Sequence, residues 1–366
     1  MKVSSFALFA VWLAWVSGAE ALPVAETSIP PTAFHQLQKT GFDHFYNLEY
    51  DQAISTFQTL RDSAPDNPAV YNNLAAAYFY KQLFAAGVLQ GESFAASNRI
   101  FRNKIQSDPI LDRQFWSANR TAIRLCEQRL KLNKTDENAL YACGVAYAAR
   151  ATHQGLIERS RLEALANGRK GSDYHVELAR LHSRDYDAYL VPGLLDYVVG
   201  SLPASLKFLL FFGGITGDKQ RGIEAVEMVA QYGDQAKEDA QIMLAVLYRR
   251  AKRYEDAQRV LQKLARVYPR NHIFPLEIAS LYRLADQRQE AIAAYEEVLR
   301  NIRDGKPGYA IAPAAKLHFE LAQLYEKTGD TESAQAHLKQ VPGAVGSTED
   351  LEKQIAEMRL RMENKP

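Results

Sequence analysis

One interval between small residues recurs along this sequence and constrains its fold more than any other feature. Small residues stand twelve positions apart in three successive segments: Ala245 and Ala257, Ala279 and Ala291, Ala322 and Ala334. In each segment a tyrosine follows the first alanine by three positions. Small residues so placed let two antiparallel helices approach closely, while tyrosine and leucine fill the space between successive pairs. The pattern therefore predicts stacked helical hairpins.

The same interval continues toward the N-terminus. Gly41 and Ala53 are again twelve positions apart, and a second copy begins at Ala75 and Tyr78, with its expected small partner at Gly87. Two central copies begin at Gly144 with Tyr147 and at Gly193 with Tyr197. Repeats are therefore expected along most of the chain.

An insertion interrupts the last of these central copies. From Gly193 the next small helical position is Gly222, 29 residues away instead of 12. The 17 additional residues correspond to about 200–216, and they include the run FLLFF at 208–212. We expect this segment to lie outside the repeat core.

The order of small and large residues resembles that of the tetratricopeptide-repeat superfamily, since Ala257 and Ala291 also show its period of 34 residues. The central part resembles exported bacterial tetratricopeptide proteins and, more distantly, the eukaryotic family of the mitochondrial outer membrane and inclusion-body clearance. The residues that carry this second resemblance are Asp187, Ala188, Tyr189, Gly193, Tyr197, Gly200, Leu202, Pro203, Gly217, Asp218, Gly222 and Ile223. The resemblance covers about residues 34–341 and implies a helical scaffold with no catalytic residues, which binds a protein or peptide along its concave side.

The predicted fold class is all-α, an α-solenoid of about six or seven tetratricopeptide-like hairpins with an apolar helical insertion near 200–216. The expected organisation is a signal peptide (1–21), a flexible leader (22–33), N-terminal repeats (34–135), irregular central repeats with the insertion (136–232), C-terminal repeats (233–345), and a capping helix and tail (346–366).

The N-terminus has the pattern of a secretory signal peptide. Lys2 precedes an apolar run of eleven residues, Phe6–Val16, and small residues follow it. Eleven residues cover about half of the ~30 Å hydrocarbon core as a helix, so a retained membrane span is disfavoured. Cleavage is expected after Ala19 or Ala21, with export to a periplasm or a similar space.

Two cysteines, Cys126 and Cys143, both lie in apolar helical patterns. The favoured interpretation is two small buried side chains. A disulfide between adjacent helices in an oxidising compartment is the alternative. Zinc is not expected, because the spacing and the companion ligands are lacking.

Other chemistry is not indicated. The 44 basic and 43 acidic residues nearly cancel, so no nucleic-acid partner is expected. His175 and His182 are seven apart, too far along a helix to share a metal, and are expected at the surface or in the groove. Neither a phosphate-binding loop nor a zinc-protease motif is present. We expect no enzyme activity and no cofactor, and no pattern indicates an oligomeric state.

Two candidate partner-binding elements remain. The first is a groove lined by helix residues outside the packing face: Arg249, Arg250, Glu277, Arg283, Lys316, Glu320, Gln323 and Lys327. The second is the apolar segment with Leu206, Phe208, Leu209, Phe211 and Phe212. Large apolar side chains need cover, so this segment is interpreted either as a plug folded into the protein's own core or as a surface that docks on a partner or a membrane.

Overall fold

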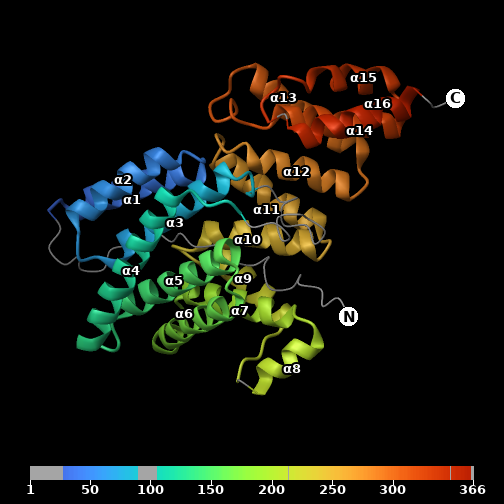
Figure 1. Ribbon diagram of the computed structural model, residues 1–366. Coiled ribbons are helices and arrows are strands. Elements are labelled where there is room, and N and C mark those ends of the chain that lie inside the picture. The colour runs from blue at the N-terminus through green and yellow to red at the C-terminus, as the bar shows by residue number, and fades with distance from the viewer. Residues whose placement is uncertain (1–27, 90–104, 213, 347, 364–366) are drawn as a thin grey trace. The chain divides into compact units, whose positions relative to one another are not determined.

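The computed structural model describes residues 28–89, 105–212, 214–346 and 348–363 (Figure 1). The expected signal peptide, 1–19 or 1–21, lies outside these residues. Within the described ranges the secondary structure is helical and contains no strand. The chain divides into two compact units, of which the first ends at Lys252 and the second begins at Arg253.

The first unit is built from helical hairpins. Helix α1 packs with α2, α3 with α4, α5 with α6, and α7 with α9. The helices are α1 (Pro31–Tyr46), α2 (Tyr50–Ser63), α3 (Pro68–Ala85), α4 (Pro109–Leu132), α5 (Glu137–His153), α6 (Arg161–Leu181), α7 (Leu190–Gly200), α8 (Ala204–Phe212), α9 (Lys219–Tyr232) and α10 (Lys237–Arg250). A π-helical turn (Gln154–Glu158) follows α5, and a 3₁₀ turn (Tyr186–Tyr189) precedes α7.

The second unit repeats the same construction. Its helices are α11 (Tyr254–Val267), α12 (Ile273–Leu284), α13 (Arg288–Arg303), α14 (Ala314–Thr328), α15 (Thr331–Gln340) and α16 (Glu349–Glu363). Helix α12 packs with α13, and α14 with α15. The capping helix α16 buries Ile355 and Met358 against Phe319 and Leu338 of the last hairpin. An apolar end of the stack is thereby covered.

Polar side chains fix where several helices begin. The first backbone N–H groups of a helix have no partner within it, and an Asn or Asp just before the helix supplies one. Asn67 accepts a hydrogen bond from the Ala69 N–H at 3.0 Å, and Asp136 accepts one from Ala139 at 3.0 Å. Asp108, Asp218 and Asp330 cap α4, α9 and α15 in the same way.

Packing through small residues confirms the predicted hairpins. Ala279 and Ala291 are completely buried in one apolar cluster of α12 and α13, and Ala322 and Ala334 are equally inaccessible between α14 and α15. At the N-terminus the ring of Phe57 fills the space beside Gly41. Ala245 and Ala257 belong to different units, so their pairing stays a prediction.

The insertion near 200–216 is also confirmed. A side chain on Gly193 would meet Ala225 and the Gly222 carbonyl, so α7 and α9 lie against each other as one hairpin. Helix α8 lies between them in sequence only, and Figure 1 shows it projecting away from the α7–α9 pair. The chain returns to the hairpin at Gly217, which contacts Val199 and Gly200.

Two local expectations differ from the structure. Gly87 is not in a second helix: it follows the end of α3 with a φ of +67°, and α3 packs instead with α4. Residues 31–33 of the expected leader form the first turn of α1, because a proline at the first helical position costs no hydrogen bond.

Candidate partner-binding site

Six of the eight predicted groove residues lie together in the second unit. Glu277 and Arg283 belong to α12, and Lys316, Glu320, Gln323 and Lys327 belong to α14. The α14 residues follow one another by four, three and four positions, so they form a stripe along one helix face. Leu276 of α12 and Leu317 of α14 share an apolar cluster. The polar residues are thus carried by two neighbouring helices of the same unit.

An ion pair joins the two helices within this stripe. The Arg283 Nε lies 3.2 Å from a Glu320 carboxylate oxygen, and these side chains are 25% and 12% exposed. Glu277, Lys316 and Gln323 are half-buried beside them, and Lys327 is exposed. The lining therefore offers a neutralised pair with further basic and polar groups, a surface suited to a polar or mixed-charge segment.

The two remaining predicted residues belong to the other unit. Arg249 and Arg250 lie at the end of α10, Arg249 only 8% exposed and Arg250 half-buried. The structure therefore does not bring all eight residues together within one unit.

Helix α8 carries the second candidate element. It contains no buried residue. Phe208, Leu209, Phe211 and Phe212 are 63–73% exposed, while Leu206 is half-buried. The Phe208 and Phe212 rings meet edge to face, with centroids 4.9 Å apart, so they contact each other and not a core. The interpretation of this segment as an internal plug is wrong, because the side chains point away from the hairpins.

The first unit also has a cavity of about 340 Å³ that the sequence analysis did not find. Helices α4, α5 and α6 and the connection between α4 and α5 line it through Leu130, Lys134, Leu140, Lys170, Asp173, Tyr174 and Glu177. Since these residues come from three helices and a connection, no local spacing in the sequence identifies them as neighbours.

A cluster of charged and aromatic groups borders this cavity. The Tyr147 hydroxyl donates to Glu127 at 2.6 Å, and the Lys170 ammonium lies 2.9 Å from Glu127 and 2.6 Å from the Tyr147 oxygen. Burial works to raise the pKa of Glu127, but the hydrogen bonds from Tyr147 and Lys170 hold that pKa below its usual range. Burial and the Glu127 carboxylate raise the pKa of Tyr147. The cluster is mutually satisfied, and its groups hold α4, α5 and α6 together.

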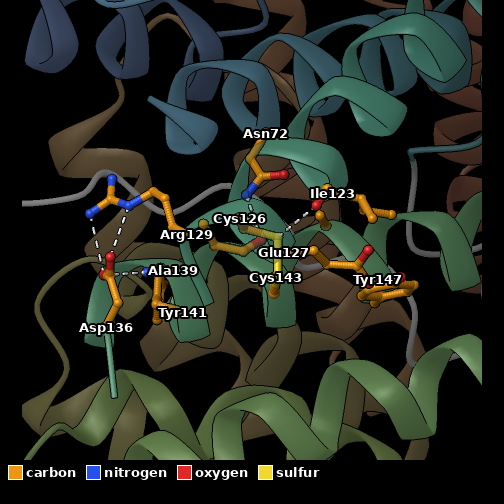
Figure 2. The surroundings of a disulfide bond; sticks show 12 residues. Asn72, Ile123, Cys126, Glu127, Arg129, Asp136, Ala139, Tyr141, Cys143 and Tyr147 are labelled. Atoms are coloured by element: carbon orange, nitrogen blue, oxygen red, sulfur yellow. Dashed lines mark hydrogen bonds and ion pairs between the residues drawn. A yellow bond between two sulfur atoms is a disulfide. The ribbon is translucent and has the colours of Figure 1, made fainter. Parts of the chain in front are cut away.

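A disulfide joins α4 to α5, as Figure 2 shows. Cys126 and Cys143 are both completely buried, as the favoured interpretation expects. Their sulfur atoms, however, are bonded to each other. The interpretation as two separate apolar side chains is therefore wrong. Nearby, Arg129 binds the Asp136 carboxylate through two nitrogens, at 2.9 and 3.3 Å (Figure 2).

Two histidines of the first unit are buried. His153 stacks on Phe115 and lies 2.7 Å from Asp112, and burial lowers its pKa although Asp112 opposes this. His175 stacks on Tyr141, and burial lowers its pKa to about 4. The expectation that His175 lies at the surface or in the groove is wrong, whereas His182 is exposed.

The described residues show neither a metal-binding cluster nor a membrane-spanning helix. No group of three or more His, Cys, Asp or Glu side chains there is placed to hold a metal ion. Among the described helices, none is both long enough and apolar enough to cross a membrane.

Family models identify the repeats. One tetratricopeptide-repeat model matches residues 41–93 and 242–309, and a second matches 315–341. The matched segments include the Ala279–Ala291 and Ala322–Ala334 pairs, whose packing is described above. These matched segments are tetratricopeptide repeats, which in general form helical scaffolds that bind proteins.

Solved structures similar to this chain include two described as tetratricopeptide-repeat proteins. One from Parabacteroides merdae is 14% identical, with 90% of this chain and 99% of that chain covered and a TM-score of 0.33. The C-terminal part of one from Cytophaga hutchinsonii is 14% identical, covering 86% and 98%, with a TM-score of 0.43. Yeast Tom70 is 13% identical, covering 91% and 96%, with a TM-score of 0.32. No curated protein matches the sequence.

Proposed function

We propose that this chain is a non-catalytic, exported scaffold that binds a protein or peptide partner along the polar stripe of α12 and α14. The observation that carries the proposal is the arrangement around the Arg283–Glu320 pair. There Lys316 and Gln323 are half-buried and Lys327 is exposed, all on one face of α14. Partly buried polar groups on a rigid helix face can bind a ligand without losing much side-chain entropy.

Export to a periplasm is supported by two independent features. The N-terminal sequence has the pattern of a signal peptide. The only two cysteines of the chain form a disulfide. Disulfides persist in oxidising compartments and are rare in the cytosol.

The experiment starts from a photoreactive residue in place of Gln323 in intact cells, with identification of the crosslinked protein. The affinity of that purified partner is then measured by titration. We expect Lys316→Glu with Lys327→Glu to weaken binding by about tenfold or more, since both cations face the ligand in this proposal. Lys339→Glu is the matched control, because Lys339 is exposed on the partner helix α15.

A charge swap adds a second arm. Arg283→Glu with Glu320→Arg preserves an ion pair between α12 and α14 but reverses its direction. We expect weaker partner binding with little change in stability. If neither the lysine variants nor the swap alters the affinity, the stripe is not the binding site.

A second candidate function is supported by α8. Four large apolar side chains that no hairpin covers suggest a protein that docks peripherally on a lipid surface or on a membrane protein. Crosslinking from a photoreactive residue at Phe211 in intact cells tests this. Products with lipid or with a membrane protein support docking, and the absence of either argues against it.

A further inference from the structure

Helix α8 has two distinct sides. At 100° per residue, Phe208, Leu209, Phe211 and Phe212 fall within an arc of about 160°, and these are the four exposed large apolar side chains of the helix. The half-buried Leu206 and Leu210 lie on the opposite side. An apolar arc of this width normally faces a protein core. Here the side that faces the protein is narrow and consists of Leu206 and Leu210, while the wide apolar arc faces outward.

The base of the helix is held firmly. Gly217 and Gly200 touch where the insertion leaves and rejoins the α7–α9 hairpin. Beside them Arg221 binds the Asp196 carboxylate through two nitrogens, each at 2.7 Å. At the far end the helix terminates in a tight turn, in which Gly214 has a φ of +69° and the Ile215 N–H donates to the Leu210 carbonyl. The outward arc is therefore presented by an ordered structure.

The charge around the arc suits a phospholipid surface. Between Asp196 and Asp218 the sequence contains one charged residue, Lys207, and no carboxylate. Lys207 is exposed and lies at the margin of the apolar arc. Lys219, at the start of α9, is also exposed. Lysines beside an exposed aromatic and leucine face are the pattern of helices that lie in a membrane interface.

The size of the arc argues against a protein partner. Each of the four side chains has a surface of about 200 Å² and is about two-thirds exposed, so the exposed apolar area of the arc is about 500 Å². A stable protein interface buries about 800 Å² on each partner. The arc is smaller than that, and a lipid leaflet needs no matching surface. A nine-residue helix is about 13 Å long, which fits the interface and does not span it.

We propose that α8 is a membrane-docking helix whose Phe208, Leu209, Phe211 and Phe212 enter the outer part of an anionic phospholipid leaflet, with Lys207 at the headgroups. The proposal rests on the second candidate function above and names its partner as lipid. It does not involve the polar stripe of α12 and α14.

The test is flotation of the purified protein with vesicles of phosphatidylcholine, with and without phosphatidylglycerol. The wild type is expected to float, more with the anionic lipid. Phe208→Asp with Phe211→Asp should lower the vesicle-bound fraction by roughly tenfold or more. Leu132→Asp with Leu162→Asp is the matched control, because these leucines of α4 and α6 are 92% and 83% exposed and lie outside the arc. The control should float like the wild type.

A second measurement does not depend on a disruptive change. The variant Phe211→Trp should give a blue-shifted fluorescence when vesicles are added, and brominated phospholipid should quench it. The wild type, which has Trp116 in α4, supplies the background signal. Thermal unfolding of each variant shows whether it is folded.

Three results would overturn the lipid proposal. They are a wild type that binds neither vesicle, a Phe208→Asp/Phe211→Asp variant that floats normally, and a Phe211→Trp variant whose fluorescence vesicles leave unchanged. If α8 instead forms dimers, sedimentation will show self-association that the aspartates abolish. Because partner binding by the stripe is measured in a separate titration, failure of the lipid proposal leaves the scaffold proposal standing. If a residue at Phe211 crosslinks to a membrane protein and the protein does not bind vesicles, α8 docks on that membrane protein and the lipid proposal is wrong.

Discussion

The ring of His175 in α6 occupies the space that a side chain at Gly144 in α5 would need. A second position of this hairpin is also crowded, since a Cβ on Gly171 would lie 2.8 Å from the Gly144 carbonyl oxygen. The α5–α6 hairpin therefore packs backbone against backbone, with a buried imidazole filling the remaining gap.

Replacing Gly144 tests this packing directly. We expect Gly144→Ala to lower the free energy of unfolding by about 1–3 kcal/mol, because the added methyl group overpacks the helix contact. Denaturant unfolding followed by circular dichroism measures the change. In a His175→Ala background the same substitution should cost nothing, and the better helix propensity of alanine could even stabilise by up to about 1 kcal/mol. Equal costs in both backgrounds would contradict the contact.

Burial of His175 also predicts a pH dependence. Its pKa is lowered to about 4 by burial, against an ordinary value near 6.5. The unfolded chain therefore binds a proton more readily than the folded one, and stability falls as pH falls from 6.5 toward 4. Between pH 7 and pH 5 the loss from this group is about 2 kcal/mol.

The check is to measure the free energy of unfolding at pH 7 and pH 5 for the wild type and for His175→Gln. The variant should show a smaller loss. Some dependence will remain, because burial also lowers the pKa of His153 in the same unit. An unchanged pH dependence in the variant would show that His175 is not the group responsible.

The disulfide should stabilise the first unit measurably. It closes a loop with a sequence separation of 17, and loops of about that length gain about 3 kcal/mol from the chain-entropy effect. We expect Cys126→Ala with Cys143→Ala to lower the free energy of unfolding by about 2–4 kcal/mol. Alkylation of the unfolded, unreduced protein should label neither cysteine. Labelling of both cysteines in protein isolated without reductant would mean that the bond does not form.

The sequence predicts the fold best where the interval between small residues is regular. Ala279 with Ala291 and Gly193 with Gly222 pair as expected, the second despite the insertion. The interval fails for α5 and α6. There Gly144 packs against Gly171, 27 residues later, because the π-helical turn and a longer connection intervene. For α3 the twelve-residue interval predicts that the small residue of the second helix is Gly87, whereas the helix that packs with α3 starts at Pro109.

The candidate sites were only partly predictable, for a physical reason. The stripe on α14 follows from helical periodicity alone. Whether the apolar arc of α8 faces inward or outward depends on the direction in which a short connection leaves α7. The hydrophobic pattern of the segment does not predict that direction. The bond between Cys126 and Cys143 depends in the same way on the alignment of two neighbouring helices.

Excision of the insertion tests both the fold and the docking helix. Removing residues 200–216 joins Val199 to Gly217, which already touch, and restores the twelve-residue interval between Gly193 and the small residue that follows. Because α8 buries none of its residues, the main cost of the excision is the loss of the buried Leu202, and we expect the free energy of unfolding to fall by no more than about 3 kcal/mol. The helical signal should fall only by the share of α8, and vesicle binding should be lost. A variant that replaces 204–212 with nine Gly and Ser residues keeps the loop length and serves as the control. A larger loss of stability in the excised protein, with the control unaffected, would mean that the connection itself supports the α7–α9 hairpin. A large loss in both proteins would mean that α8 belongs to the core.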